Sequence, residues 1–172
     1  SQDITNFVEG NSSLRVEGKT GEGSTLIVYN PSLPDDYTAY SNVNFSLYFE
    51  KIPSNFIRAG IYIIGSGSWS EWYIEKEQVQ EGKWQEFSFP LDKPTSTVPH
   101  GEVYPAIIAL QLIAPEGAEF VCSLDDVKLV SFPKFMDGLS ENHLDWKSDQ
   151  DRATISQDIT NFVEGNSSLR VE

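Results

Sequence analysis

The chain has 172 residues, of which 26 are acidic and 12 basic, so its formal net charge at pH 7 is −14. A surface with this charge repels phosphate groups, which argues against binding to nucleic acid and to anionic membranes. No hydrophobic run is long enough to insert into a bilayer. Cys122 is the only cysteine, so no disulfide forms within the chain, and its apolar neighbours predict a buried, unreactive thiol.

Alternating apolar and polar residues predict strands from end to end of the chain. In the run 43–50 the inward residues are Val43, Phe45, Leu47 and Phe49, and in 57–63 the inward row begins at Ile57. Turns rich in Gly and Pro separate the runs, and 92–105, with three prolines, is expected to be irregular. The expected strands are 13–17, 24–30, 43–50, 57–63, 71–77, 84–91, 106–114 and 120–130. This pattern predicts an all-β protein, a two-sheet antiparallel β-sandwich.

The two ends of the chain carry the same seventeen residues. Residues 1–17 and 156–172 both read SQDITNFVEGNSSLRVE, and the second copy begins 155 residues after the first. This identity indicates a tandem array of whole domains, or a segment duplicated by cloning. We therefore predict one sandwich repeat over 1–155 and the start of the next repeat over 156–172.

The segment 135–155 has no counterpart before Ser1, so the repeat is cut in the middle and its opening strand comes last. In one interpretation, 135–155 folds back into the opening position and gives a permuted sandwich. In the other, it completes a neighbouring molecule by strand exchange. If it folds back, the two copies 1–17 and 156–172 compete for one strand position. One copy is then displaced, disordered or paired with another molecule, and the last of these outcomes is self-association through the duplicated strand.

Five segments carry a resemblance to a known family. They are Phe135-Met136-Asp137-Gly138 with Trp146, the run 8–16 (VEGNSSLRV), the run 82–87 (GKWQEF), Ile107–Ile113, and 123–129 (SLDDVKL). In this order they resemble the β-jelly-roll carbohydrate-binding modules of bacterial polysaccharide-degrading enzymes. The resemblance implies a jelly-roll sandwich, a secreted or cell-surface location and a polysaccharide or oligosaccharide partner.

The same resemblance implies one structural Ca²⁺ near the junction of the first and last strands. Its ligands would be Asp126, Asp137 and Glu9, or Glu164 of the second copy in place of Glu9, because Ca²⁺ prefers carboxylate oxygens. The chain departs from the family at Met136, where a Glu is usual. In the alternative interpretation, Asp125 and Asp126 accept hydrogen bonds from turn amides and bind no metal.

A sugar-binding surface needs exposed aromatic rings beside hydrogen-bonding groups, because sugar rings stack their C–H faces and bond through their hydroxyls. The alternative for each aromatic ring is packing in the core. Carboxylates are so numerous that the sequence does not single out the two catalytic carboxylates of a glycosidase. Neither His100 nor His143 has the spacing of a metal site or of a catalytic triad. We therefore expect no catalysis. The candidate sugar-binding residues are Arg58, Tyr62, Trp69, Trp72, Gln111 and Trp146.

The sequence therefore predicts a non-catalytic module that binds polysaccharide of the β-glucan or mannan type and tethers a larger secreted protein to it. The alternative is a structural or adhesive tandem-repeat domain of a cell-surface protein. In that case the rings only pack, and the chain assembles by strand exchange.

Overall fold

The computed structural model describes residues 13–31, 33, 37–65, 67–101 and 106–130, together with the backbone of 135–136, 147–148, 153–157 and 169–170. These residues form strands and two short 3-10 helices, η1 (Tyr37–Ala39) and η2 (Lys76–Gln78), and none of their helices is long and apolar enough to cross a membrane. The strands are β1 (Leu14–Lys19), β2 (Thr25–Asn30), β3 (Asn42–Lys51), β4 (Arg58–Gly65), β5 (Ser68–Glu75), β6 (Trp84–Pro90), β7 (Ser96–Pro99), β8 (Ile107–Ile113), β9 (Glu119–Val130), β10 (Phe135–Met136), β11 (Lys147–Ser148), β12 (Ala153–Gln157) and β13 (Leu169–Arg170).

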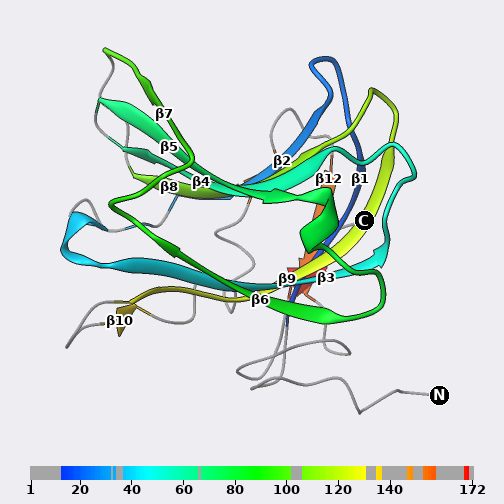
Figure 1. Cartoon of the computed structure of the whole chain (residues 1–172). Helices are drawn as coiled ribbons and strands as arrows, with labels where there is room; N and C mark the ends of the chain where they lie inside the picture. The colour runs from blue at the N-terminus through cyan, green and yellow to red at the C-terminus, as the bar shows by residue number, and fades with distance from the viewer. Residues whose placement is uncertain are drawn as a thin grey trace.

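The strands form two antiparallel sheets that pack against each other, so the predicted all-β sandwich is confirmed. The β9 sheet has the order β13-β12-β1-β9-β3-β6, with β10 also beside β9. The β4 sheet has the order β11-β2-β8-β4-β5-β7. Figure 1 shows β7, β5, β4, β8 and β2 in one layer and β6, β3, β9, β1 and β12 in the other.

The core lies between the two layers and is built from one face of β1 to β5, β8 and β9. Val43, Phe45, Leu47 and Phe49 of β3 are all buried, as their alternation predicts. The predicted inward position of Ile57 is wrong, because β4 begins at the next residue and the Ile57 side chain is exposed. From the β4 sheet, the core receives Leu26, Val28, Ala59, Ile61, Ile63, Trp72, Ile74, Ile108, Leu110 and Leu112.

A β-bulge in β9 changes which residues of that strand face the core. Ser46 of β3 pairs with Asp125 and Asn44 pairs with Lys128, so one residue of β3 faces two residues of β9. Asp126 takes a left-handed backbone conformation there, with φ of 51°. The Asp125 Oδ1 atom accepts a hydrogen bond from the Asp126 backbone N–H at 2.7 Å. The Asp125 carboxylate therefore bonds the backbone amide of the bulge residue that follows it.

Two parts of the β4 sheet differ from the sequence-based expectation. β5 begins at Ser68, three residues before the predicted strand 71–77, and β7 forms in the proline-containing stretch that was expected to be irregular. β7 pairs with the outer edge of β5, where Trp69 lies opposite Val98 and Glu71 opposite Ser96. Pairing of backbone groups along an otherwise open edge accounts for a strand that local residue preferences do not predict.

The described parts of 135–155 pair with earlier strands of the same chain. β10 pairs with β9, β11 with β2 and β12 with β1. This is the pairing that the fold-back interpretation expects. The jelly-roll order of the strands and the assignment of 1–155 as one repeat stay predictions.

Candidate binding face

The side of the β4 sheet that points away from the core gathers four of the six candidate sugar-binding residues. Alternate residues of β4 and β8 belong to the core, so Arg58 and Tyr62 of β4 and Gln111 of β8 point to the outer side. Gln111 lies opposite Gly60 of β4 on one flank and Ile27 of β2 on the other. We call this side of the sheet the outer β4 face.

Trp69 and Trp72 lie on opposite sides of β5. Trp72 points toward the core with Ile74 and is 1% exposed, and its Nε1 donates a hydrogen bond to the Pro90 carbonyl oxygen at 2.9 Å. The prediction that Trp72 offers a stacking surface to a sugar is therefore wrong. Trp69 is an odd number of residues away, so the pleat turns it to the outer β4 face, where it is 41% exposed.

Trp69 is held between two other rings. The Tyr62 ring lies nearly parallel to it, with the centroids 6.5 Å apart and an angle of 17° between the planes. The His100 ring meets it edge to face, at 6.1 Å and 65°. Tyr62 itself is 8% exposed. The exposed indole therefore rests on a buried ring and is fixed in orientation, as a preformed stacking surface must be.

A second cluster on the outer β4 face combines a cation, a phenol and a carboxylate. The Arg58 guanidinium carbon lies 3.8 Å from the centre of the Tyr73 ring. The Tyr73 hydroxyl donates a short hydrogen bond to Glu71 Oε2. This hydrogen bond raises the pKa of the Tyr73 phenol, and desolvation by burial raises it further. The Glu71 carboxylate is thus already engaged by a neighbour on its own strand.

Gly60 leaves the middle of the outer β4 face without a side chain. It lies opposite Gln111 on one flank and Tyr73 on the other. A Cβ atom at this position would come within 2.9 Å of the Trp72 backbone oxygen, so the close approach of β4 and β5 requires glycine. The polar end of Gln111 and the Tyr73 ring consequently have no side chain between them.

The structure describes only part of the predicted calcium site. Asp126 Oδ1 lies 2.7 Å from the Lys128 ammonium, so this carboxylate already has a positive partner. Glu9 and Asp137 lie outside the described residues, as does Trp146 of the sugar-binding set. Within the described ranges, no three His, Cys, Asp or Glu side chains are grouped to hold a metal ion. Calcium therefore stays a prediction.

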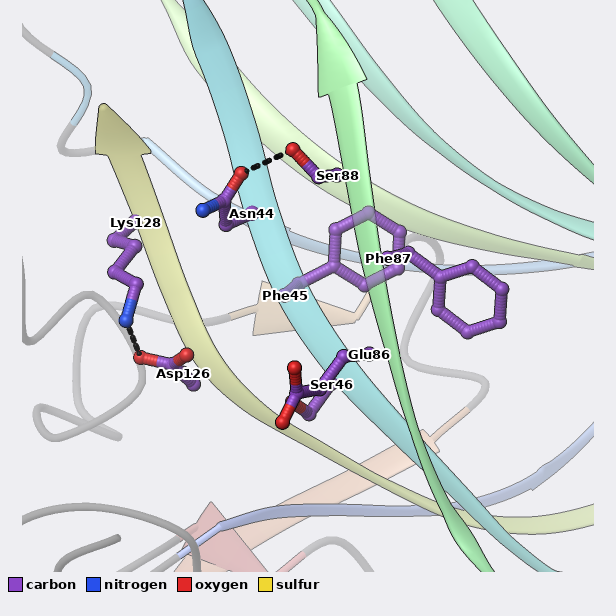
Figure 2. Close-up of a pocket in the computed structure, with 8 residues that line it drawn as sticks. All are labelled: Asn44, Phe45, Ser46, Glu86, Phe87, Ser88, Asp126 and Lys128. Carbon is purple, nitrogen blue, oxygen red and sulfur yellow. Dashed lines mark hydrogen bonds and ion pairs between the residues drawn. The ribbon is translucent and has the colours of Figure 1, made fainter. Parts of the chain in front are cut away.

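A polar cavity on the other side of the sandwich was not predicted. It lies on the outside of the β9 sheet and has a volume of about 470 Å³. Figure 2 shows Ser88 hydrogen-bonded to Asn44 and Lys128 paired with Asp126 along its wall. Its lining residues are Asn44, Phe45, Ser46, Glu86, Phe87, Ser88, Asp126 and Lys128.

The cavity and the outer β4 face differ in the chemistry that they offer to a ligand. The rings of Phe45 and Phe87 stack on each other at 5.5 Å, and both pack with the core. The cavity therefore offers hydrogen-bonding groups, while the outer β4 face adds an exposed ring to such groups. Sequence analysis missed the cavity because its polar residues come from three strands that only the sheet register brings together.

Sequence analysis also missed Glu71, Tyr73 and His100 as members of the outer β4 face. Alternation along 69–73 was the available signal, since Trp69, Glu71 and Tyr73 are spaced by two residues. His100 had no such signal, because the fold of β7 brings it to Trp69. No family model, curated protein or solved structure matches the chain.

Proposed function

We propose that this chain is a non-catalytic module that binds polysaccharide on the outer β4 face. The observation that carries the proposal is the Trp69 ring, which is 41% exposed and lies parallel to the buried Tyr62 ring. An exposed indole gives up favourable burial, and a fixed aromatic plane suits the C–H face of a sugar ring. The ligand would lie across Trp69 and extend toward the centre of the sheet.

Polar groups beside the rings support the same proposal. Gln111 supplies an amide, with both donor and acceptor capacity, next to the gap at Gly60. The Arg58 guanidinium is stacked on Tyr73 and carries several N–H donors. Such donors on the outer β4 face suit acceptor oxygens of a ligand. Sugar hydroxyls and ring oxygens supply such acceptors.

The proposal includes no chemical step on the sugar. Hydrolysis of a glycosidic bond uses two carboxylates placed on either side of that bond. On the outer β4 face, Glu71 is hydrogen-bonded by Tyr73, and Glu75 at the end of the strand is exposed to solvent. Both carboxylates then lie beside the bound polysaccharide and have no catalytic role. The module serves to tether a larger secreted or cell-surface protein to that polysaccharide.

Affinity for one site should be modest, in the range of roughly micromolar to millimolar dissociation constants, because few groups are buried and such surfaces are wet. Neutral chains of the β-glucan or mannan type fit best. The net charge of −14 repels polyanionic glycans over long range. Tandem copies of the module would raise the overall affinity by increasing the effective concentration of binding sites.

The test compares two tryptophan variants, one on each sheet. Trp69→Ala removes the exposed ring of the outer β4 face, while Trp84→Ala removes a half-buried ring that packs on Tyr48 of the β9 sheet. Soluble β-glucan, mannan and xylan are titrated into each protein by calorimetry. We expect Trp69→Ala to weaken binding at least about tenfold, which is the loss of one stacked ring, and Trp84→Ala to bind as the unmodified chain does.

Three outcomes would count against the proposal. Binding that is lost only in Trp84→Ala would move the site to the β9 sheet and its cavity. Equal glycan affinity of the unmodified chain, Trp69→Ala and Trp84→Ala would show that Trp69 does not contact the sugar. An absence of heat with every glycan would leave the structural or adhesive repeat as the better account of this domain.

A further inference from the structure

The polar cavity outside the β9 sheet lies at the β-bulge of β9. In a regular strand, one residue would separate Asp125 from Lys128, because their partners on β3 are two residues apart. The bulge places two residues there, and Val127 is the one that enters the core. Asp126 is therefore an extra residue, and its side chain lines the cavity together with Lys128.

An aspartate at this extra position has a backbone cost. Asp126 has a φ of 51°, a conformation that glycine takes without steric conflict. Its Oδ1 atom pairs with the Lys128 ammonium at 2.7 Å, and the two side chains are 16% and 24% exposed. Only Oδ1 takes part in this pair, so Oδ2 can accept a hydrogen bond from a ligand. Strained backbone of this kind is frequent at ligand sites.

A chain of hydrogen bonds orients the Asn44 amide in the cavity wall. Asn42 Nδ2 donates to Ser88 Oγ at 3.0 Å, and Ser88 Oγ donates to Asn44 Oδ1 at 2.7 Å. Because the Asn44 oxygen is engaged, its NH₂ group is the part of the amide that can serve a ligand. Figure 2 shows this nitrogen on the side away from Ser88. The donor is thus oriented before a ligand arrives, which lowers the cost of binding.

The charges and rings of the lining residues limit the class of ligand. The carboxylates of Glu86 and Asp126 outnumber the ammonium of Lys128, so anions such as phosphate are disfavoured. A cation would have to displace the Lys128 ammonium from Asp126. The rings of Phe45 and Phe87 pack with the core, so they offer no stacking surface to an aromatic ligand. A neutral molecule rich in hydroxyls fits, since each hydroxyl both donates and accepts hydrogen bonds.

We propose that this cavity is a second carbohydrate site, which takes one neutral sugar unit through hydrogen bonds. Its volume of about 470 Å³ lies in the ordinary range for small-molecule sites. One sugar hydroxyl would donate to Asp126 Oδ2 and a neighbouring oxygen would accept from Asn44 Nδ2. The exposed Glu86 carboxylate would accept from a further hydroxyl. This site lies on the other sheet from the outer β4 face and does not depend on it.

Binding through hydrogen bonds determines both the affinity and the selectivity of this site. Each bond to a sugar replaces a bond to water, so the net gain is small and dissociation constants should be roughly millimolar. A site that bonds hydroxyls rejects an isomer whose hydroxyl points elsewhere, because a polar group of the protein is then left unpaired. The cavity should therefore distinguish sugars that differ at a single hydroxyl.

The test is two-dimensional NMR of the isotopically labelled Trp69→Ala chain, which lacks the exposed ring of the outer β4 face. Glucose, mannose, galactose and xylose are each titrated to about 100 mM, well above the expected dissociation constants. A chelator is present, so that a sugar held by Ca²⁺ does not contribute. We expect saturating shifts of the backbone amides that line the cavity and of the Asn44 side-chain NH₂ signals. The four sugars should differ in affinity.

Three variants in the same background locate the bound sugar. Lys128→Met and Glu86→Ala should each weaken binding at least about tenfold, because each removes a charged hydrogen-bonding group. Lys83→Met is the matched control, since it removes an exposed ammonium that does not line the cavity, and it should keep the affinity. Glu86 is exposed, so Glu86→Ala keeps the test decisive if Lys128→Met does not fold.

Four results would overturn this second site. The first is an absence of saturating shifts at the cavity with every sugar. The second is equal affinity for all four sugars. The third is unchanged affinity in Glu86→Ala, or equal weakening in Lys83→Met. The fourth is binding that occurs in the unmodified chain and is absent from Trp69→Ala, which would assign the sugar to the outer β4 face alone. Cavity shifts that persist in Trp69→Ala support the second site whether or not polysaccharide binds at Trp69.

Discussion

Cys122 makes the stability of this sandwich sensitive to alkaline pH. The residue lies in β9 between Val16 and Phe49 of the neighbouring strands, and its side chain is fully buried. Desolvation by burial raises the pKa of the thiol from 9.0 to about 12. Above pH 9 the unfolded chain therefore loses a proton that the folded chain retains. The free energy of unfolding must fall as the pH rises from about 9 to about 12.

The size of this effect follows from the separation of the two pKa values. They differ by about three pH units, and each unit corresponds to about 1.4 kcal/mol, so the full loss is roughly 4 kcal/mol at pH 12. At pH 10.5, half of this range has been crossed, and the thiol accounts for a loss of about 2 kcal/mol. Below pH 9 its ionisation contributes no loss, because the thiol is protonated in both states.

Urea unfolding followed by tryptophan fluorescence at pH 8, 9.5 and 10.5 measures this loss, with Cys122→Ala as the control. The variant has a small cavity, which lowers stability equally at every pH, but it has no thiol to ionise. We expect the unmodified chain to lose about 2 kcal/mol more than Cys122→Ala between pH 8 and pH 10.5. Parallel pH profiles for the two proteins would refute the burial argument. So would rapid reaction of the folded thiol with a disulfide reagent at pH 8.

The core position of Trp72 and the close strand approach at Gly60 give two further predictions. Trp72→Phe should lower the free energy of unfolding by roughly 2–3 kcal/mol in urea titrations, from lost volume and a lost hydrogen bond, with glycan affinity kept. If Trp72→Phe instead loses glycan binding without losing stability, Trp72 belongs to the ligand site. Gly60→Ala should cost about 1–3 kcal/mol because its Cβ meets the Trp72 backbone oxygen at 2.9 Å. Gly101→Ala, with no atom within 4 Å of its Cβ, should change stability by less than about 0.5 kcal/mol, and equal losses in both variants would contradict this account.

The two tryptophans of β5 show how far sequence analysis reaches at the candidate site. The stretch SWSEWYIE places aromatic rings on both sides of the strand, so alternation separates Trp69 from Trp72 but does not say which one is buried. The register with β4 and the packing of the β9 sheet decide that question. Arg58, Tyr62 and Gln111 were correctly predicted to point away from the core, because their neighbours along the strands are strongly apolar. The predicted open ring of Tyr62 is wrong, because this side chain is 8% exposed.

The sequence by itself determined the strand pattern, the two-sheet class and the duplication of seventeen residues, because these depend on residues close together or on identity along the chain. The tertiary structure alone decided which rings stay exposed, that β7 and His100 border the outer β4 face, and that β12 pairs with both β1 and β13. These features depend on pairing between residues far apart in the chain. The physical reason is that local alternation gives a strand two faces and two edges, while only its partners in the fold determine which of them are covered.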